Sequence, residues 1–316
     1  MNERKYSIIS SIVRLVFVGV IVLSFSGFTK TVFAEDVTTC QQQISELRLH
    51  NGHYVEVEPN VELFYIDKGE GTPIIFVPGW SFSADSFLYQ IEHFSKTYRV
   101  IAIDPRSQGY STKTAEGNNY PVHGRDLANL INKLQLNNIV LAGWSFGNLD
   151  TWEYVKQNGL KKIQAVIMID NKPRSITDGK LGSLDKQVNN NLDSQEHYRQ
   201  FMKAFAENKL LTRKIASSEE LNLLIGESLQ MPYDAARDLY VSGKFGNCEE
   251  IVKEISKKKP SLLILSADRV EPTRTWFKTN AAKTDVDVLG KHMMFWEFPN
   301  QFNKFLEEFF QKNGIN

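Results

Sequence analysis

The sequence is poor in cysteine. Only Cys40 and Cys248 occur among its 316 residues, which excludes a small fold held together by many disulfides. Neither cysteine has the spacing of a zinc ligand pair, and we expect no metal and no other cofactor. If the chain is exported to an oxidising compartment, a disulfide between the two thiols is possible. The sequence does not decide whether it forms, because it does not give the distance between the two cysteines.

The chain also lacks an excess of charge of one sign. Its 37 Lys and Arg residues equal its 37 Asp and Glu residues. A protein that binds nucleic acid or an anionic membrane through a basic surface has a positive excess, so we expect neither partner. Internal repeats and low-complexity tracts are absent too, and the sequence indicates no particular oligomeric state.

A long apolar run is missing as well. The stretch from Leu15 to Phe28 is shorter than the roughly 20 residues that span a bilayer. Basic residues precede it, and Val32-Phe33-Ala34 offers a small-residue cleavage site. This pattern predicts a signal peptide over residues 1–34 and a secreted or periplasmic mature chain without stable membrane insertion.

Two alternatives to a cleaved signal peptide remain open. One is an uncleaved membrane anchor. The other is a lipoprotein acylated at Cys40, which is disfavoured because Glu35 and Asp36 separate that cysteine from the apolar run. Removal of residues 1–34 would leave 33 basic and 36 acidic residues, a net charge of −3.

What the chain does contain is an alternation of strand and helix patterns. Residues 54–58 and 61–66 bracket Pro59-Asn60 and predict a hairpin at a sheet edge. Solid apolar runs predict buried strands, and helical periodicity lies between them; the runs cover residues 73–78, 98–103, 139–142, 163–169, 261–265 and 286–289. We therefore predict an α/β fold, a mostly parallel sheet with helices on both faces, formed by residues 35–171 and 260–316.

Residues 172–259 break this alternation. The segment is rich in Lys, Asn, Gln, Glu and Ser, and helical patterns lie near 195–211, 219–229 and 233–241. We favour an inserted helical lid over the carboxyl ends of the strands, where such sheets bind ligands. Ordinary peripheral helices are the alternative.

The stretch with the most specific chemistry is Gly143-Trp144-Ser145-Phe146-Gly147. An apolar strand precedes it and a helical pattern follows, as a nucleophile elbow requires. The turn holds the serine with Oγ exposed, and the two glycines let the strand and the helix approach each other. The motif predicts Ser145 as a nucleophile.

A serine hydroxyl needs a base to take its proton, and the base needs a carboxylate to orient it. His292 follows the last predicted strand and is the expected base. Asp268 follows the strand 261–265 and is the favoured acid; Asp170, at the end of the strand 163–169, is the alternative. Glu271, or no acid at all, is a weaker option.

The tetrahedral intermediate of acyl transfer needs two preset N–H donors. The N–H of Phe146 and that of Trp80, in the turn Pro78-Gly79-Trp80-Ser81, are the candidates. Apolar residues near the catalytic groups, among them Trp144, Met293 and Phe295, predict a pocket for a small apolar ester. Because no basic cluster lies beside the elbow in the sequence, phosphorylated or strongly anionic substrates are not expected.

These motifs together resemble the α/β-hydrolase fold, in the branch that includes bacterial carboxylesterases and cofactor-free haloperoxidases or perhydrolases. The resemblance runs from about Glu46 to Phe310. It is carried by Val77-Pro78-Gly79-Trp80, the segment Asp104 to Ser111, the elbow, Ile169-Asp170-Asn171, and His292-Met293-Met294-Phe295-Trp296. Pro78 and Ser107 replace a histidine and a glycine common in the family, and the loop at Asp268 is shorter than usual.

The resemblance implies an exported serine hydrolase that cleaves carboxylic esters through an acyl-enzyme. Perhydrolysis or halide oxidation through a peracid, with the same triad, is the first alternative. A binding protein that retains the hydrolase fold without catalysis is the second. The serine at the elbow argues against dehalogenases and epoxide hydrolases of this fold, which use an aspartate there.

Overall fold

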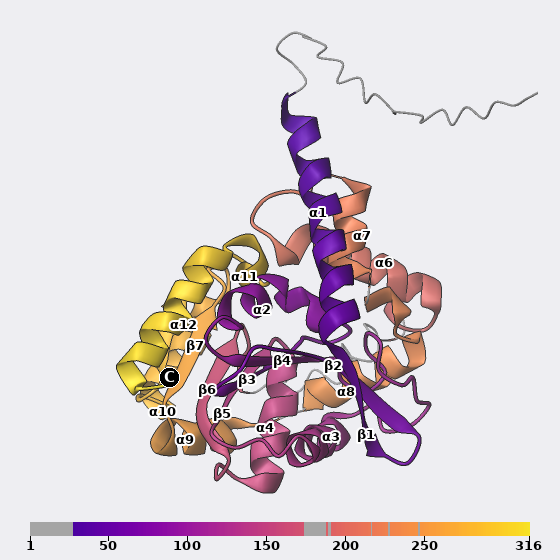
Figure 1. The fold of residues 1–316 in the computed structure, drawn as a ribbon. Helices are drawn as coiled ribbons and strands as arrows, with labels where there is room; N and C mark the ends of the chain where they lie inside the picture. The colour runs from indigo at the N-terminus through magenta and orange to yellow at the C-terminus, as the bar shows by residue number, and fades with distance from the viewer. Residues whose placement is uncertain (1–27, 174–187, 189–190, 216, 227, 246) are drawn as a thin grey trace, which may run out of the picture.

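The computed structural model describes residues 28–316 except 174–187, 189–190, 216, 227 and 246. The described strands form one sheet of eight, in the order β1-β2-β4-β3-β5-β6-β7-β8 (Figure 1). The strands are β1 (Gly52–Glu58), β2 (Val61–Lys68), β3 (Pro73–Val77), β4 (Arg99–Ile103), β5 (Ile139–Trp144), β6 (Ile163–Ile169), β7 (Ser261–Leu265) and β8 (Asp285–Val288).

The sheet is antiparallel at one edge and parallel elsewhere. β1 and β2 form the expected edge hairpin, and β2 runs antiparallel to β4. All pairings from β4 through β8 are parallel. Every residue of β5 and β7 is buried, because helices cover both faces of the sheet.

Helices pack on the two faces in separate groups. On one face α3 (Tyr120–Lys133) packs against α4 (Gly147–Asn158), which also contacts β5 and α9 (Glu249–Lys258). On the other lie η1 (Ala84–Phe87), α2 (Leu88–Phe94), α11 (Met294–Glu297) and α12 (Pro299–Asn313), which contact one another (Figure 1). The predicted fold class, an α/β-hydrolase fold with a mostly parallel sheet, is confirmed.

The segment between β6 and β7 is helical where the structure describes it. It contains α6 (Gln195–Phe205), η2 (Ala206–Leu210), α7 (Ser218–Ile225), η3 (Ser228–Gln230), α8 (Tyr233–Phe245) and α9. α9 contacts α4 on the face of the sheet and leads directly into β7. The helices before α9 are therefore the ones available to cover the carboxyl edge, and their role as a lid stays a prediction.

The N-terminal helix α1 (Phe28–Asn51) extends away from the body at its start and docks on it at its end (Figure 1). Ile44 and Leu47 are buried there, and the helix contacts β1, β2 and α7. Most of the predicted signal peptide, residues 1–27, lies outside the described residues, and the expected cleavage point after Ala34 falls within α1. Among the described helices, none has both the length and the apolar character of a membrane span.

Both cysteines carry free thiols. Cys40 Sγ lies 3.3 Å from the Tyr89 hydroxyl, and Cys248 is buried. Burial raises the pKa of the Cys248 thiol to about 12, which keeps it protonated and unreactive at neutral pH. Cys40 and Cys248 therefore do not form the disulfide that the sequence left undecided.

After β7 the chain forms α10 (Val270–Asn280), crosses to β8 and then reaches the loop that contains His292. Parallel strands β5, β6, β7 and β8 therefore end at the same edge of the sheet, and the loops after them meet there. This edge holds the residues that the sequence singled out.

Candidate active site

Ser145 occupies a sharp turn between β5 and α4. Its φ angle of 53° lies in the left-handed region, which is strained for a residue with a side chain. Its backbone N–H donates to Ile169 O over 2.8 Å, and the Asn171 side-chain amide donates to Ser145 O over 2.7 Å. The end of β6 thus fixes the turn that presents the serine hydroxyl.

The two elbow glycines are required by close packing. A Cβ on Gly143 would approach the backbone of Asn148 to 2.8 Å. A Cβ on Gly147 would collide with the carbonyl oxygens of Val77 and Pro78. A side chain at either position would therefore separate strand and helix, as the sequence pattern predicts.

His292 lies against the serine. Its Nε2 is 2.9 Å from Ser145 Oγ. The imidazole is buried, and its loop is tied to η2 because the N–H groups of His292 and Met293 donate to the carbonyls of Lys209 (3.4 Å) and Leu210 (2.9 Å). The Trp144 indole also donates to His292 O over 2.7 Å. Both the core and the inserted segment hold the imidazole in place.

The carboxylate beside His292 belongs to Asp170. Its Oδ2 accepts a hydrogen bond from His292 Nδ1 over 2.5 Å. Asp268, the acid favoured by the sequence, is instead exposed, and it lines a neighbouring cavity together with Lys172 and Glu271. The preference for Asp268 is therefore wrong, and the alternative, Asp170, makes the contact.

The physical reason is the way Asp170 leaves β6. Its φ of 46° turns the chain immediately after the strand, and its N–H donates to Ile264 O over 2.8 Å. The backbone N–H and hydroxyl of Ser266 both donate to Asp170 Oδ1, over 2.9 and 2.8 Å. Oδ2 is left to face the imidazole, while Asp268 lies exposed in the turn that the Arg269 N–H closes on Ser266 O over 3.0 Å.

The surroundings of Asp170 favour its charged form. Burial alone would raise the pKa of this carboxyl, but the hydrogen bond and charge of His292, the Ser266 N–H and the Arg269 guanidinium together hold it below its usual value. A carboxylate that stays ionised accepts a hydrogen bond from Nδ1–H, so Nε2 is the ring nitrogen that can accept from the Ser145 hydroxyl.

The turn after β3 lies directly against the serine. A Cβ on Gly79 would be 3.0 Å from Ser145 Cβ. No described residue accepts a hydrogen bond from the backbone N–H of Trp80 or of Phe146. Both are therefore available to a substrate oxygen, as an oxyanion hole requires.

A residue that the sequence did not assign to the site holds this turn. Gln108 is buried, and its side chain accepts from Ser81 N–H over 2.8 Å and donates to Phe82 O over 2.9 Å. Gln108 lies in the loop 104–111. The sequence signal for its role was the resemblance of this loop to the corresponding loop of the α/β-hydrolase family. Ser107 in that loop has a φ of 64°, the conformation that the family's glycine adopts readily.

The cavity at Ser145 has a volume of about 320 Å³. One wall is the elbow and the turn at Gly79; the other is formed by aromatic residues of α6 and α8, which were not predicted. The lining residues are Gly79, Trp80, Phe82, Trp144, Ser145, Phe146, Phe201, Phe205, Lys209, Tyr240, Lys244, Arg269 and His292. Trp144 was expected there.

Met293 and Phe295 do not line this cavity. Phe295 is fully buried, stacks on Phe87 with ring centroids 5.0 Å apart, and meets the edge of Trp144 at the same distance. Met293 faces a small cleft shared with Ile44. Their assignment to the substrate pocket is wrong, because the chain turns into α11 immediately after His292 and carries both side chains into the core.

The cavity also contains basic side chains. Lys209, Lys244 and Arg269 line it, contrary to the expectation of a site without a basic cluster. They come from η2, α8 and the loop after β7, all distant from the elbow in the sequence. No local motif could have indicated that they converge.

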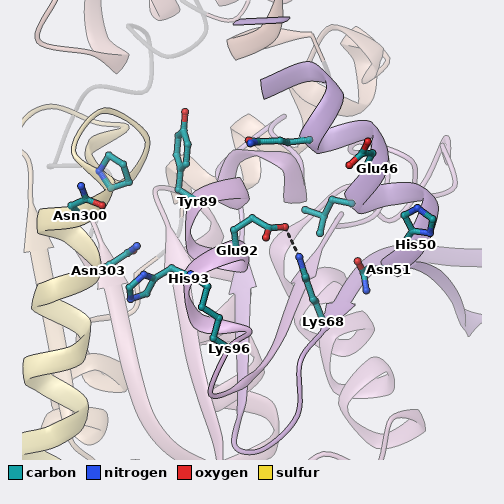
Figure 2. A pocket seen from close by; sticks show the side chains of 13 residues that line it. Glu46, His50, Asn51, Lys68, Tyr89, Glu92, His93, Lys96, Asn300 and Asn303 are labelled. Carbon is teal, nitrogen blue, oxygen red and sulfur yellow. Dashed lines mark hydrogen bonds and ion pairs between the residues drawn. The ribbon is translucent and has the colours of Figure 1, made fainter. Parts of the chain in front are cut away.

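A larger cavity lies elsewhere, between α1, α2 and α12. It has a volume of about 530 Å³, and Figure 2 shows charged and polar side chains around it, including His50, His93 and the Lys68–Glu92 ion pair. It holds none of the residues around Ser145. Among the described residues no serine or cysteine lines this cavity, so it offers no nucleophile for a histidine to activate, and His93 pairs with Glu307 over 2.7 Å.

Comparison with known proteins agrees with this geometry. A family model described as alpha/beta hydrolase fold matches residues 72–233. The chain belongs to this family. Ser145, Asp170 and His292 occur along the chain in the order typical of that fold, nucleophile, acid and histidine, and the aspartate follows β6.

Individual relatives in this family cover the chain to different extents. The chain is 25% identical over 275 residues to a putative non-heme chloroperoxidase of Synechocystis sp., spanning 81% of this chain and 97% of that protein. It is 35% identical over 119 residues to the AB hydrolase superfamily protein YisY of Bacillus subtilis, but this match spans 37% of the chain and only 44% of that protein. A crystal structure of a putative aryl esterase from Burkholderia cenocepacia shares the fold, with a TM-score of 0.72 at 23% identity over 84% of this chain and all of that one.

Proposed function

We propose that this member of the α/β-hydrolase family is a serine hydrolase that cleaves carboxylic esters through an acyl-enzyme. The observation that carries the proposal is the continuous hydrogen-bonded line from Ser145 Oγ to His292 Nε2, and from His292 Nδ1 to the buried Asp170 carboxylate. The N–H groups of Trp80 and Phe146 beside it, which bond to none of the described residues, support acyl transfer, because a tetrahedral intermediate needs donors there.

In the acylation step Ser145 Oγ attacks the ester carbonyl while His292 Nε2 takes the hydroxyl proton. The carbonyl oxygen becomes an oxyanion, which accepts hydrogen bonds from the N–H groups of Trp80 and Phe146. The bond between the carbonyl carbon and the alcohol oxygen then breaks, and His292 returns the proton to the leaving alcohol. Asp170 keeps the imidazole oriented and stabilises its charged form.

Deacylation repeats these steps with water. His292 takes a proton from water, whose oxygen attacks the acyl carbon. The bond between the acyl carbon and Ser145 Oγ then breaks, and His292 gives the proton to Oγ. A carboxylic acid and free enzyme result. Aromatic side chains of α6 and α8 line the cavity in which the acyl group would lie.

Perhydrolysis is a second candidate, and the match to a protein named as a putative chloroperoxidase favours testing it. In this reaction hydrogen peroxide takes the place of water and releases a peracid from the same acyl-enzyme. A comparison of peracid formation from acetate ester and hydrogen peroxide with the rate of ester hydrolysis would separate the two activities.

A binding protein without catalytic activity is the third candidate. The failure of all serine-directed probes to label folded protein would favour it.

We further propose that the protein acts after export through the signal peptide of residues 1–34. N-terminal sequencing of the mature protein tests this: a start at Glu35 supports cleavage after Ala34, and a retained Met1 in the membrane fraction supports an anchor.

The first prediction concerns the nucleophile. Ser145→Ala removes the attacking oxygen and should lower kcat for p-nitrophenyl acetate by about 10⁴-fold or more. Ser86→Ala, a buried serine outside the catalytic cavity, is the matched control and should retain activity. Wild-type turnover in the Ser145→Ala protein would refute the proposed function.

A further inference from the structure

The cavity at Ser145 holds a surplus of positive charge. Lys244, on α8, is partly buried, and its ammonium lies 4.7 Å from the centre of the Tyr240 ring and 5.7 Å from that of Phe146. Within the described part of the chain no carboxylate forms an ion pair with it. Arg269 and Lys209 line the same cavity.

The nearby carboxylates offset this charge only in part. Asp170 Oδ2 is 4.0 Å from Arg269 Nη1 but is already bonded to His292. Asp268 and Glu271 line the adjoining cavity, which shares Lys244 and Arg269 as a boundary. Glu271 is bonded to the hydroxyl of Thr275 over 2.7 Å, and Asp268 is exposed to solvent.

Packing on aromatic rings explains the position of Lys244 only in part. A cation over a ring gains about 0.5–2 kcal/mol, but burial costs an ammonium part of its hydration, and like charges repel in a partly enclosed site. Burial, followed by the charges of Lys172 and Arg269, lowers the pKa of Lys244 accordingly. An anion in the cavity would compensate the ammonium for its lost hydration and would offset the repulsion between the positive charges.

We propose that the ester carries a second group, a carboxylate, which binds between Lys244 and Arg269 while the scissile carbonyl faces Ser145. This inference rests on the proposed function, since it assigns the substrate class of the same site. A carboxylate is the smallest organic anion that a guanidinium can bind through two parallel hydrogen bonds, which suits a cavity of about 320 Å³.

Matched ester pairs test the proposal kinetically. Mono-p-nitrophenyl adipate is compared with its neutral terminal amide, and 4-acetoxybenzoate with 4-acetoxybenzamide, so that the anion is placed in the acyl or in the alcohol half. We expect kcat/KM for the carboxylate member of at least one pair to exceed that of its amide by about tenfold, the effect of one partly buried ion pair. Lys244→Met and Arg269→Gln should bring this ratio towards one, whereas Lys133→Met, which removes an exposed charge at the end of α3, should leave it unchanged.

A binding measurement separates this proposal from the catalytic one. Calorimetry on the Ser145→Ala protein compares the non-hydrolysable 4-acetamidobenzoate with 4-acetamidobenzamide, and adipate with adipamide. Tighter binding of an anion, lost in the Ser145→Ala, Lys244→Met double variant, supports the proposal even if no ester is turned over. Equal binding of the anion and its neutral amide in both pairs overturns the proposal. A kcat/KM ratio of carboxylate ester to amide ester at or below one in both ester pairs, in an enzyme that hydrolyses the neutral esters, also overturns it.

Discussion

At the scale of single residues, two aspartates compete for one histidine. Asp170 and Asp268 both follow strands whose carboxyl ends meet at the same edge, so local sequence favours neither decisively. The choice is made by Ser266, whose N–H and hydroxyl fix Asp170 Oδ1 and direct Oδ2 to His292. Such a contact between two strands leaves no trace in the spacing of residues along the chain.

Replacement of each aspartate tests this assignment. Asp170→Asn should lower kcat by about 10³–10⁴-fold, because an amide favours the wrong tautomer of the imidazole. Asp268→Asn is the matched control and should keep kcat within about threefold, since its side chain is exposed and does not touch His292. Steady-state kinetics on p-nitrophenyl acetate measures both, and the reverse ranking would restore Asp268 as the acid.

The lowered pKa of Asp170 also predicts how its contribution to stability depends on pH. Because the folded pKa lies below the ordinary value of 3.8, the unfolded state binds more protons as the solution is acidified. The stabilisation is present above about pH 4 and is lost as pH falls through the folded value. Urea unfolding of the wild type and Asp170→Asn should therefore give a difference in the free energy of unfolding that is present at pH 5 and shrinks as the pH falls below 4; a difference that grows below pH 4 would contradict the assignment.

At the scale of elements, the catalytic groups are held by loops that other loops brace. The turn at Gly79 is fixed from the loop 104–111, and the His292 loop is fixed from η2. Trp80 also donates from its indole to Ala236 O on α8 over 2.8 Å. The inserted helices are therefore coupled to both the oxyanion turn and the base, which makes their packing part of the site.

Gln108 allows this bracing to be tested. Gln108→Met removes the bonds to Ser81 and Phe82 and should lower kcat by about tenfold or more while KM changes less than about threefold, because the oxyanion donors move relative to Ser145. Gln157→Met, at an exposed position on α4, is the control and should match the wild type. A change in KM alone would mean that Gln108 shapes the pocket and does not position the oxyanion turn.

At the scale of the whole molecule, α1 is fastened to the hydrolase body by a few apolar side chains. Leu47 is 3% exposed, whereas Leu49 on the same helix is 78% exposed. Leu47→Ala should lower the free energy of unfolding by about 2–5 kcal/mol, and Leu49→Ala should change it by less than about 0.5 kcal/mol. Chemical denaturation measures both, and equal small effects would show that α1 contributes nothing to the body.

The sequence allowed most of the fold and part of the site to be predicted. Apolar runs, glycine spacing and strand–helix alternation are local signals, and they located the sheet, Ser145, His292 and the turn at Gly79. The pocket could not be predicted in the same way, because Phe201, Tyr240 and Lys244 reach it through the packing of the inserted helices. Met293 and Phe295 were misplaced for a related reason: adjacency to His292 in the chain does not decide which side of a short helix faces the cavity.

One measurement tests the central claim most directly. The protein is incubated with a fluorophosphonate, digested, and mapped by mass spectrometry to find the residue that carries the adduct. We predict a single adduct on Ser145, absent in Ser145→Ala and formed far more slowly in Asp170→Asn. An adduct on another residue, or no adduct in folded and otherwise intact protein, would contradict the account.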